Sequence, residues 1–293
     1  MDVEEDEATT GDARQDVETE DGPGADADQL EDAPSDVPDV SPPCLTPTGH
    51  DEDGDGVDDG CDNCPTYVNA GQMDEDGDTL GDACEEPGDP ELFSNIIGFD
   101  PFTSHATSPG LEWEVWGGTW LGSGDSVSGT SMPLGGNYWC PTLVGQPLAV
   151  ESEFRLLSAG SEGADVWGCV LLGLIPEGTG SAGGAFSTCC FSHPGRELSI
   201  WHWRTGSPSL ERLAANTAPV ESPEYPPEMQ RRIHFLWDGR VLRCRLDTGA
   251  ELAESSTVLY VPSLSMREEL EFGAPGIRVY NGTAEFRSFI AYQ

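Results

Sequence analysis

The sequence predicts a mainly β protein: an antiparallel two-sheet β-sandwich, preceded by a small irregular repeat and a disordered acidic N-terminus. Three observations support this fold class. From Glu91 onward, short apolar runs alternate with period two and are separated by Gly, Pro, Asn and Asp. Helical periodicity is nearly absent there. Before Glu91, an acidic motif occurs twice, starting at Asp51 and at Asp74.

The negative charge is concentrated at the N-terminal end. The chain has 293 residues and a formal net charge of −41. Its first ninety residues hold 31 acidic side chains against Arg14 alone, and the chain contains no lysine. No segment offers the basic surface that nucleic acid or anionic lipid requires, so neither is an expected partner. Concentrated carboxylates favour hard cations instead.

Residues 1–43 are expected to be a disordered acidic tether, because they hold no aromatic residue and few aliphatic ones. An acidic tail that is merely solvated and has no function of its own fits this composition equally well. No apolar run could span a membrane. The opening "MDVEEDEATT" shows no leader peptide. Either export uses another route, or the true start lies further upstream with a cleaved leader or a lipoprotein cysteine, and we favour the second. Nine cysteines favour an extracellular or cell-surface location.

Residues 44–90 carry the two acidic motifs, "DEDGDGVDDGCDNCP" and "DEDGDTLGDACE". A calcium loop of the EF-hand kind places ligands at positions one, three, five, seven, nine and twelve, with position seven using its backbone carbonyl. On that spacing, the first copy offers Asp51, Asp53, Asp55, the carbonyl of Val57, Asp59 and Asp62. The second copy offers Asp74, Asp76, Asp78, the carbonyl of Leu80, Asp82 and Glu85.

Two copies in matching phase are typical of a Ca²⁺ site and not of a merely solvated acidic run. Bound Ca²⁺ would cancel the repulsion between the carboxylates, so we expect the loops to unfold without it. Thr79 stands where the first copy has Gly56 at the turn. The second loop is therefore expected to be distorted or weaker.

The cysteines and the absence of flanking helices distinguish this segment from an EF-hand. The segment "CDNCP", then Asn69 and Gln72, then "DEDGDTLGDAC", resembles a thrombospondin type 3 repeat. The resemblance implies short loops wrapping a string of calcium ions, and an added oxygen ligand from Asn69. It also implies the disulfides Cys44–Cys61 and Cys64–Cys84. Asp58 departs from the glycine that the family often has there.

The dockerin module also repeats an Asp-rich loop at about this interval. Its loops begin helices that carry a binding face, whereas "CDNCPTYVNAGQM" has no amphipathic helix and sets two cysteines beside a proline. Dockerin is therefore the second choice.

Residues 91–293 are predicted to form the sandwich. In "AVESEFRL", Val150, Phe154 and Leu156 share one strand face, and the other, solvent face holds Glu151, Glu153 and Arg155. The segment "RRIHFLWDGRVLRCRL" predicts a hairpin with a type I′ turn at Asp238-Gly239, and "IRVYNGTAEFRSFIAY" predicts a second one at Asn281-Gly282.

The order of these strand segments resembles the concanavalin-like jelly roll of laminin G-like modules. The likeness lies in "LEWEVWGGTWL", "LAVESEFRL", "WGCVLLGL", "ELSIWHWR", "FLWDGRVLRC" and the closing segment. The likeness is one of sequence pattern. One fold can host many unrelated functions, so the likeness does not indicate what the sandwich does.

The sequence favours a non-catalytic sandwich. Glycoside hydrolases of this fold set acids on one strand face as E-x-D-x-x-E, but the pairs Glu151/Glu153 and Glu112/Glu114 lack the third acid. No G-x-S-x-G elbow or His-x-x-x-His pair occurs, and the five histidines are scattered.

Tryptophans suggest sugar stacking, because flat rings match pyranose faces. The candidates are Trp113, Trp116, Trp120, Trp201 and Trp203. For each of them, a place in the sandwich core is the more common outcome. Trp201 and Trp203 share one strand face, with His202 on the other.

The sandwich holds five cysteines: Cys140, Cys169, Cys189, Cys190 and Cys244. At most two bridges can form, which leaves one thiol. Vicinal Cys189 and Cys190 point to opposite strand faces and should have different partners, but the sequence leaves the connectivity open.

We therefore expect an extracellular calcium-binding surface protein. A calcium-ordered stalk would present a non-catalytic sandwich for adhesion to carbohydrate or to an extracellular protein. The alternatives are a glycan-degrading enzyme on the same fold and a purely structural cell-surface spacer.

Overall fold

The computed structural model describes residues 47–85, 93–103, 111–131, 135–143, 149–159, 164–175, 184–204, 209–217, 230–248 and 254–293. All of them belong to one compact unit, Ser41–Gln293. The expected tether, residues 1–43, lies outside the described residues.

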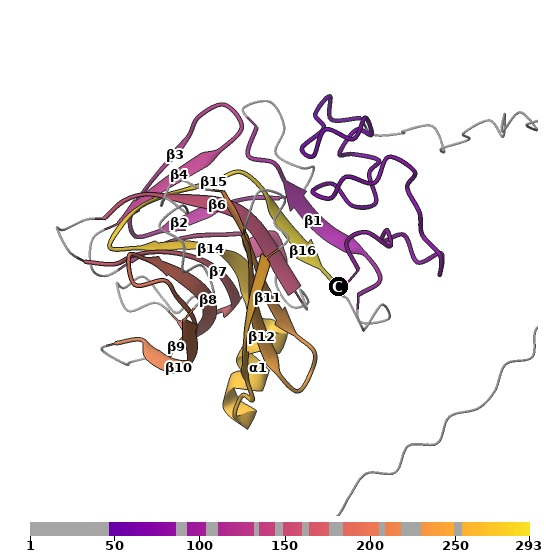
Figure 1. Cartoon of the computed structure of the whole chain (residues 1–293). Coiled ribbons are helices and arrows are strands. Elements are labelled where there is room, and N and C mark those ends of the chain that lie inside the picture. Colours follow the sequence, from indigo (N-terminus) through magenta and orange to yellow (C-terminus); the bar gives the residue numbers. More distant parts are fainter. Residues whose placement is uncertain are drawn as a thin grey trace, which may run out of the picture. The chain divides into compact units, whose positions relative to one another are not determined.

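The described residues form sixteen strands in two antiparallel sheets, which confirms the predicted sandwich (Figure 1). The nine-stranded sheet contains β1 (Ile96–Asp100), β3 (Thr119–Gly122), β4 (Val127–Ser131), β6 (Ala149–Ala159), β11 (Arg231–Trp237), β12 (Leu242–Thr248), β13 (Glu254–Tyr260), β15 (Gly282–Phe286) and β16 (Phe289–Tyr292). The seven-stranded sheet contains β2 (Glu114–Trp116), β5 (Gly136–Trp139), β7 (Val166–Leu174), β8 (Phe186–His193), β9 (Glu197–Trp203), β10 (Glu211–Thr217) and β14 (Ala274–Tyr280).

The strand order differs from the chain order in both sheets. The nine-stranded sheet runs β13-β12-β11-β6-β15-β4-β3, with β16 pairing both β6 and β1. The seven-stranded sheet runs β10-β9-β8-β7-β14-β5-β2. Among the described residues, the helical elements are η1 (Pro141–Leu143) and α1 (Leu264–Phe272). No helix in this part of the chain has the length and apolar character that crossing a membrane would need.

The main core lies between the two sheets and follows the predicted alternation. Val150, Phe154 and Leu156 point inward from β6, while Val170 and Leu172 point inward from β7. All five side chains are essentially inaccessible to solvent. Burial of such alternating faces is the main force that holds the sheets together.

Two predicted turns differ from the structure. Trp237 pairs with Leu242, so four residues connect β11 to β12 where a two-residue turn was predicted. The Asp238 carboxylate accepts hydrogen bonds from the amides of Arg240 and Val241, and this favours the longer loop. Asn281 does not begin a hairpin, because β14 and β15 belong to different sheets. Its positive φ of 54° lets the chain cross between them.

Two disulfides form within the sandwich, with different partners for the vicinal cysteines as predicted. Cys169–Cys190 joins the neighbouring strands β7 and β8, and Cys189–Cys244 joins β8 of one sheet to β12 of the other. Cys140 is the free, buried thiol among the described cysteines.

Candidate calcium centres and their junction with the sandwich

The first acidic loop brings three carboxylates together. One oxygen from each of Asp51, Asp53 and Asp55 lies within 4.8 Å of the others. Asp51 accepts hydrogen bonds from the amides of Gly54 (2.8 Å) and Gly56 (2.9 Å). Both glycines have positive φ, so the chain can curl around the carboxylates at no steric cost.

The second loop repeats this arrangement with Asp74, Asp76 and Asp78. Asp74 accepts from the amides of Gly77 (2.8 Å) and Thr79 (3.1 Å), in the same pattern as Asp51. Thr79 takes the turn with a φ of 90°, which is unfavourable for a β-branched residue. The loop therefore keeps its hydrogen bonds, and the expected distortion is backbone strain at Thr79.

The carboxylates at position nine of the two loops accept hydrogen bonds from backbone amides. Asp59 accepts from the Glu52 amide and Asp82 from the Glu75 amide, each over 2.8 Å. Asp59 also contacts His50 Nδ1 at 2.7 Å. These two carboxylates lie outside the groups of three, although they shape the same loops.

The remaining predicted ligands lie around the two loops. Asp62 accepts from the Cys64 amide (2.7 Å), and the Asn69 amide donates to Asp55 (2.8 Å), so Asn69 lies against the first loop. Glu85 lies close to the second loop. Burial and the neighbouring carboxylates, Asp76 foremost, raise its pKa.

Asp58, where the related repeats often have glycine, caps the start of the segment. Its carboxylate accepts from the amides of Thr48 and Gly49, each over 2.7 Å. The departure from the family pattern therefore adds hydrogen bonds in this chain.

The donor set of the first loop fits calcium. Within the described residues, Asp53 Oδ2 and Asp62 Oδ2 are buried without a hydrogen-bond partner. Burial raises the pKa of Asp53 to about 6, and it also raises that of Asp62. A buried carboxylate oxygen without a partner is costly, and a hard cation that prefers oxygen ligands would remove that cost.

The repeat lies against the sandwich instead of standing away from it as the expected stalk. Thr66 Oγ1 donates to Glu151 Oε1 over 2.9 Å, and Arg232 Nη2 donates to the Thr66 carbonyl over 2.6 Å. The Arg232 guanidinium also lies 4.0 Å from the centre of the Tyr67 ring. Three contacts thus connect two adjacent residues of the repeat to β6 and β11.

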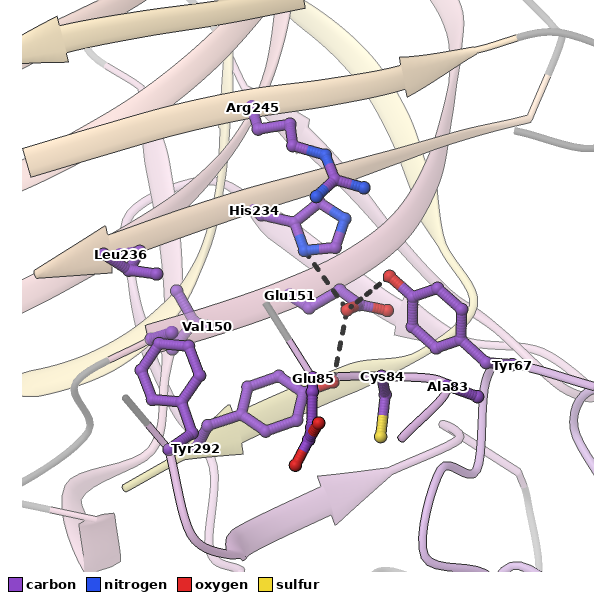
Figure 2. Close-up of a pocket in the computed structure, with 12 residues that line it drawn as sticks. Tyr67, Ala83, Cys84, Glu85, Val150, Glu151, His234, Leu236, Arg245 and Tyr292 are labelled. Atoms are coloured by element: carbon purple, nitrogen blue, oxygen red, sulfur yellow. Dashed lines mark hydrogen bonds and ion pairs between the residues drawn. The ribbon is translucent and has the colours of Figure 1, made fainter. Parts of the chain in front are cut away.

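Glu151 is the centre of this junction (Figure 2). Its Oε2 lies 3.2 Å from Tyr292 Oη, 3.3 Å from His234 Nδ1 and 3.4 Å from Tyr67 Oη. Its Oε1 forms an ion pair with Arg232 Nε at 3.2 Å. The expectation that Glu151 and Glu153 face solvent is wrong: they are 1% and 8% exposed. Thr66 and Tyr67 of the repeat lie against Glu151, and Arg232 pairs with Glu153.

The charges continue across the sheet from β11 to β12. His234 Nε2 lies 3.1 Å from Asp247, and Arg245 forms a second ion pair with the same carboxylate at 2.7 Å. Burial alone would raise the pKa of Asp247, but the hydrogen bonds and charges of His234 and Arg245 outweigh it and lower the pKa to about 2.

A pocket opens between the second loop and the sandwich beside these groups (Figure 2). Ala83, Cys84 and Glu85 form its wall on the repeat side. Its sandwich side includes Glu151, His234, Arg245, Leu236 and Tyr292. Glu85 therefore lies both beside the second carboxylate group and in the wall of the pocket.

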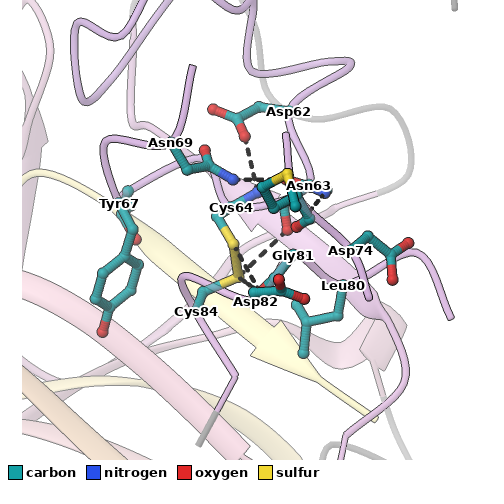
Figure 3. The surroundings of a disulfide bond; sticks show 12 residues. Asp62, Asn63, Cys64, Tyr67, Asn69, Asp74, Leu80, Gly81, Asp82 and Cys84 are labelled. Carbon is teal, nitrogen blue, oxygen red and sulfur yellow. Dashed lines mark hydrogen bonds between the residues drawn. A yellow bond between two sulfur atoms is a disulfide. The ribbon is translucent and has the colours of Figure 1, made fainter. Parts of the chain in front are cut away.

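The Cys64–Cys84 disulfide joins the two loops, as the resemblance implied (Figure 3). The Gly81 amide donates to the Asn63 carbonyl, and a Cβ at Gly81 would lie 2.7 Å from Cys64 Sγ. This close approach requires glycine. Cys61 is also disulfide-bonded, and its predicted partner Cys44 lies outside the described residues.

An apolar cluster completes the junction. Leu80 of the second loop is fully buried and belongs to one apolar cluster with six other buried residues, from Phe93 and the sandwich. These are Phe93, Phe99, Ala149, Leu236, Ile290 and Tyr292.

Two of the candidate tryptophans are structural. Trp113 and Trp120 both stack on Tyr138, with ring centres 4.6 and 5.2 Å away, and both pack against the main core. Trp113 Nε1 also donates to the buried Asp100.

Four other tryptophans lie on the outer face of the seven-stranded sheet. This tryptophan face consists of the half-buried side chains of Trp116, Trp167, Trp201 and Trp203. Trp116 and Trp203 flank Phe186, and Trp167 and Trp201 meet edge to face at 5.6 Å. His202 lies buried on the opposite strand face, as predicted. Sequence reasoning missed Trp167, although its alternation with the buried Val166 and Val170 places it outward.

Glu112 and Glu114, the other acidic pair, are exposed beside Trp113 at the start of β2. Glu151 and Glu153 instead belong to the buried ion network. The two acidic pairs thus have different environments in the described structure.

Comparison with known protein families identifies the acidic repeats. Residues 44–72 and 73–97 match the family described as "Thrombospondin type 3 repeat". These segments are therefore thrombospondin type 3 repeats, and a two-sheet antiparallel sandwich follows them. No curated protein matches the chain.

Several solved structures are similar to this chain at low sequence identity. A Bacillus subtilis protein of unknown function with a galectin-like fold is 13% identical, with 69% of this chain and 97% of that chain covered, at a TM-score of 0.48. Winged bean acidic lectin complexed with methyl-α-D-galactose is 11% identical, with 67% and 99% covered, at 0.44. The catalytic domain of a Thermotoga petrophila endo-1,3-β-glucanase is 10% identical, with 68% and 97% covered, at 0.43.

Proposed function

We propose that this chain is an extracellular calcium-binding surface protein whose sandwich binds carbohydrate in adhesion, without cleaving it. Calcium orders the repeats, and the sandwich carries the ligand-binding face. The observation that carries the calcium part is the pair of carboxylate groups, at Asp51 and at Asp74, together with buried oxygens that lack a partner.

The proposed calcium ligands follow the two loops. In the first loop they are Asp51, Asp53, Asp55, the Val57 carbonyl, Asp59 and Asp62, with Asn69 beside them. In the second they are Asp74, Asp76, Asp78, the Leu80 carbonyl, Asp82 and Glu85. Calcium, when bound, would neutralise carboxylates that otherwise repel one another. Extracellular modules of this kind bind at roughly 10⁻⁴–10⁻³ M, which suits calcium levels outside the cell.

An extracellular setting is supported by the disulfides among the described residues and by the thrombospondin type 3 repeats. Structural disulfides persist in oxidising compartments and are rare where thiols are kept reduced.

The tryptophan face supports carbohydrate as the ligand. Its indole rings are half-buried, so each is held by packing while part of it stays accessible. Trp203 is held parallel to Phe186, with an interplanar angle of 5°. A flat ring that is held in place can stack on a pyranose face without losing much side-chain entropy on binding.

A glycan array probed with the full chain in millimolar calcium, together with a hydrolysis assay on every glycan it retains, tests this function. Retention without product supports binding. Released oligosaccharide would favour the glycan-degrading enzyme, and retention of no glycan would favour a structural spacer.

A further inference from the structure

The two calcium loops differ at position seven. Val57 and Leu80 occupy equivalent places, and the amide of each donates to the preceding carboxylate, Asp55 (2.8 Å) or Asp78 (2.9 Å). The Val57 side chain is half-buried and belongs to none of the buried clusters of the described structure. The Leu80 side chain is fully buried at the junction.

Leu80 belongs to the same buried apolar cluster as residues of the sandwich. Its cluster includes residues of four strands of one sheet: Phe99 of β1, Ala149 of β6, Leu236 of β11 and Ile290 of β16. The side chain is therefore buried where strands from distant parts of the chain lie close together in the nine-stranded sheet. The backbone of the same residue closes the calcium loop.

The second loop has more need of such support than the first. Thr79, next to Leu80, is held at a φ of 90°, where the first loop has Gly56. A strained conformation persists only where its surroundings hold it in place. Packing of Leu80 fixes the backbone on one side of Thr79, and the Asp74 carboxylate binds the Thr79 amide.

We infer that Leu80 is a positioning residue that couples calcium at the second loop to the stability of the sandwich. The inference rests on the proposed calcium binding. A ligand that binds only the folded state stabilises it, and the coupling is reciprocal. Calcium therefore raises the unfolding temperature of the sandwich, and the packed Leu80 raises the calcium affinity of the second loop.

Tryptophan fluorescence reports on the sandwich alone, because all eight tryptophans follow residue 91. The experiment follows thermal unfolding of the full chain by this signal, in millimolar calcium and in excess chelator, beside calorimetric calcium titration. For the unaltered chain, calcium should raise the midpoint by about 3–6 °C.

Leu80→Ala should remove most of that calcium-dependent rise and weaken one class of calcium site about tenfold. Leu80→Val, a milder change that keeps the chain folded, should remove a smaller part. Met73→Ala is the matched control: its side chain is of similar size and lies in the same repeat, but it is 66% exposed. It should leave the rise and the affinities unchanged.

The outcomes separate the inference from the function it rests on. If the unaltered chain takes up no calcium, the proposed function fails. If it binds calcium but both Leu80 variants keep the full calcium-dependent rise, the coupling alone is wrong. A loss of stability that is equal in calcium and in chelator would also contradict the coupling.

Discussion

Arg232 of β11 and Tyr67 of the calcium repeat lie in direct contact, with the guanidinium carbon 4.0 Å from the ring centre. The same guanidinium forms ion pairs with Glu151 and Glu153 of β6. Repeat and sandwich therefore share one buried charge network, and this part of the nine-stranded sheet is a junction between them.

Removal of Glu151 should destabilise the chain strongly. The residue is 1% exposed and its carboxylate forms an ion pair with Arg232, and breaking a buried pair on one side costs about 3–5 kcal/mol. Glu151→Ala should show this loss in urea unfolding. Glu285→Ala is the control, because its ion-pair partner Arg155 is partly exposed, and it should cost about 0–1 kcal/mol. Equal losses in the two variants would contradict the described junction.

Asp247 should make the sandwich sensitive to acid. Its folded pKa of about 2 lies below the ordinary value of 3.8. Its stabilising contribution is therefore present above pH 4 and is lost as the pH falls from about 4 to 2. A depression of this size corresponds to roughly 2 kcal/mol.

Asp247→Asn should lose that stability at neutral pH and unfold with a flatter pH dependence between pH 4 and 2. Urea unfolding measured at half-unit pH steps checks this. Parallel pH curves for the variant and the unaltered chain would show that Asp247 is not the responsible group.

Removal of the Cys189–Cys244 bridge should lower the free energy of unfolding more than removal of the free thiol of Cys140. The bridge joins the two sheets across a sequence separation of 55 residues, for which chain entropy gives about 4 kcal/mol. The double variant with alanine at both positions should lose about this much. Cys140→Ala, which removes a buried thiol but no bridge, should lose far less. Similar losses would mean that packing, and not the cross-link, stabilises this part of the sandwich.

The tryptophan face should account for any glycan retention. Trp203→Ala removes an accessible ring and should weaken binding at least about tenfold, whereas Trp203→Phe keeps a flat ring and should retain most of it. Leu259→Ala, at a 58% exposed side chain of β13, controls for surface changes elsewhere. Undiminished binding by Trp203→Ala would move the ligand site away from this face.

The local sequence pattern predicted the strands, because every second residue of a strand lies on the same face and the buried face therefore appears as alternating apolar residues. Val150 and Phe154 were expected inward from β6, and Cys189 and Cys190 on opposite faces of one strand, and the structure confirms both expectations. Calcium-loop spacing likewise predicted the two carboxylate groups, since ligand geometry is encoded within a dozen residues.

What covers a face, and where a strand goes next, depends on distant segments. Glu151 has the pattern of an exposed residue, yet Thr66, 85 residues earlier, buries it. Asn281-Gly282 has the pattern of a hairpin turn, yet the strands on either side pair in different sheets. Neither outcome can be read from a short window of sequence.

Calcium titration of the full chain by calorimetry, followed by chelator, tests most directly whether metal ions order the acidic repeat. We predict saturable heat for at least two ions per chain, reversed by chelator, with Asp53→Asn and Asp76→Asn each weakening a different site. Absence of heat, with a circular dichroism spectrum that chelator leaves unaltered, would contradict the account.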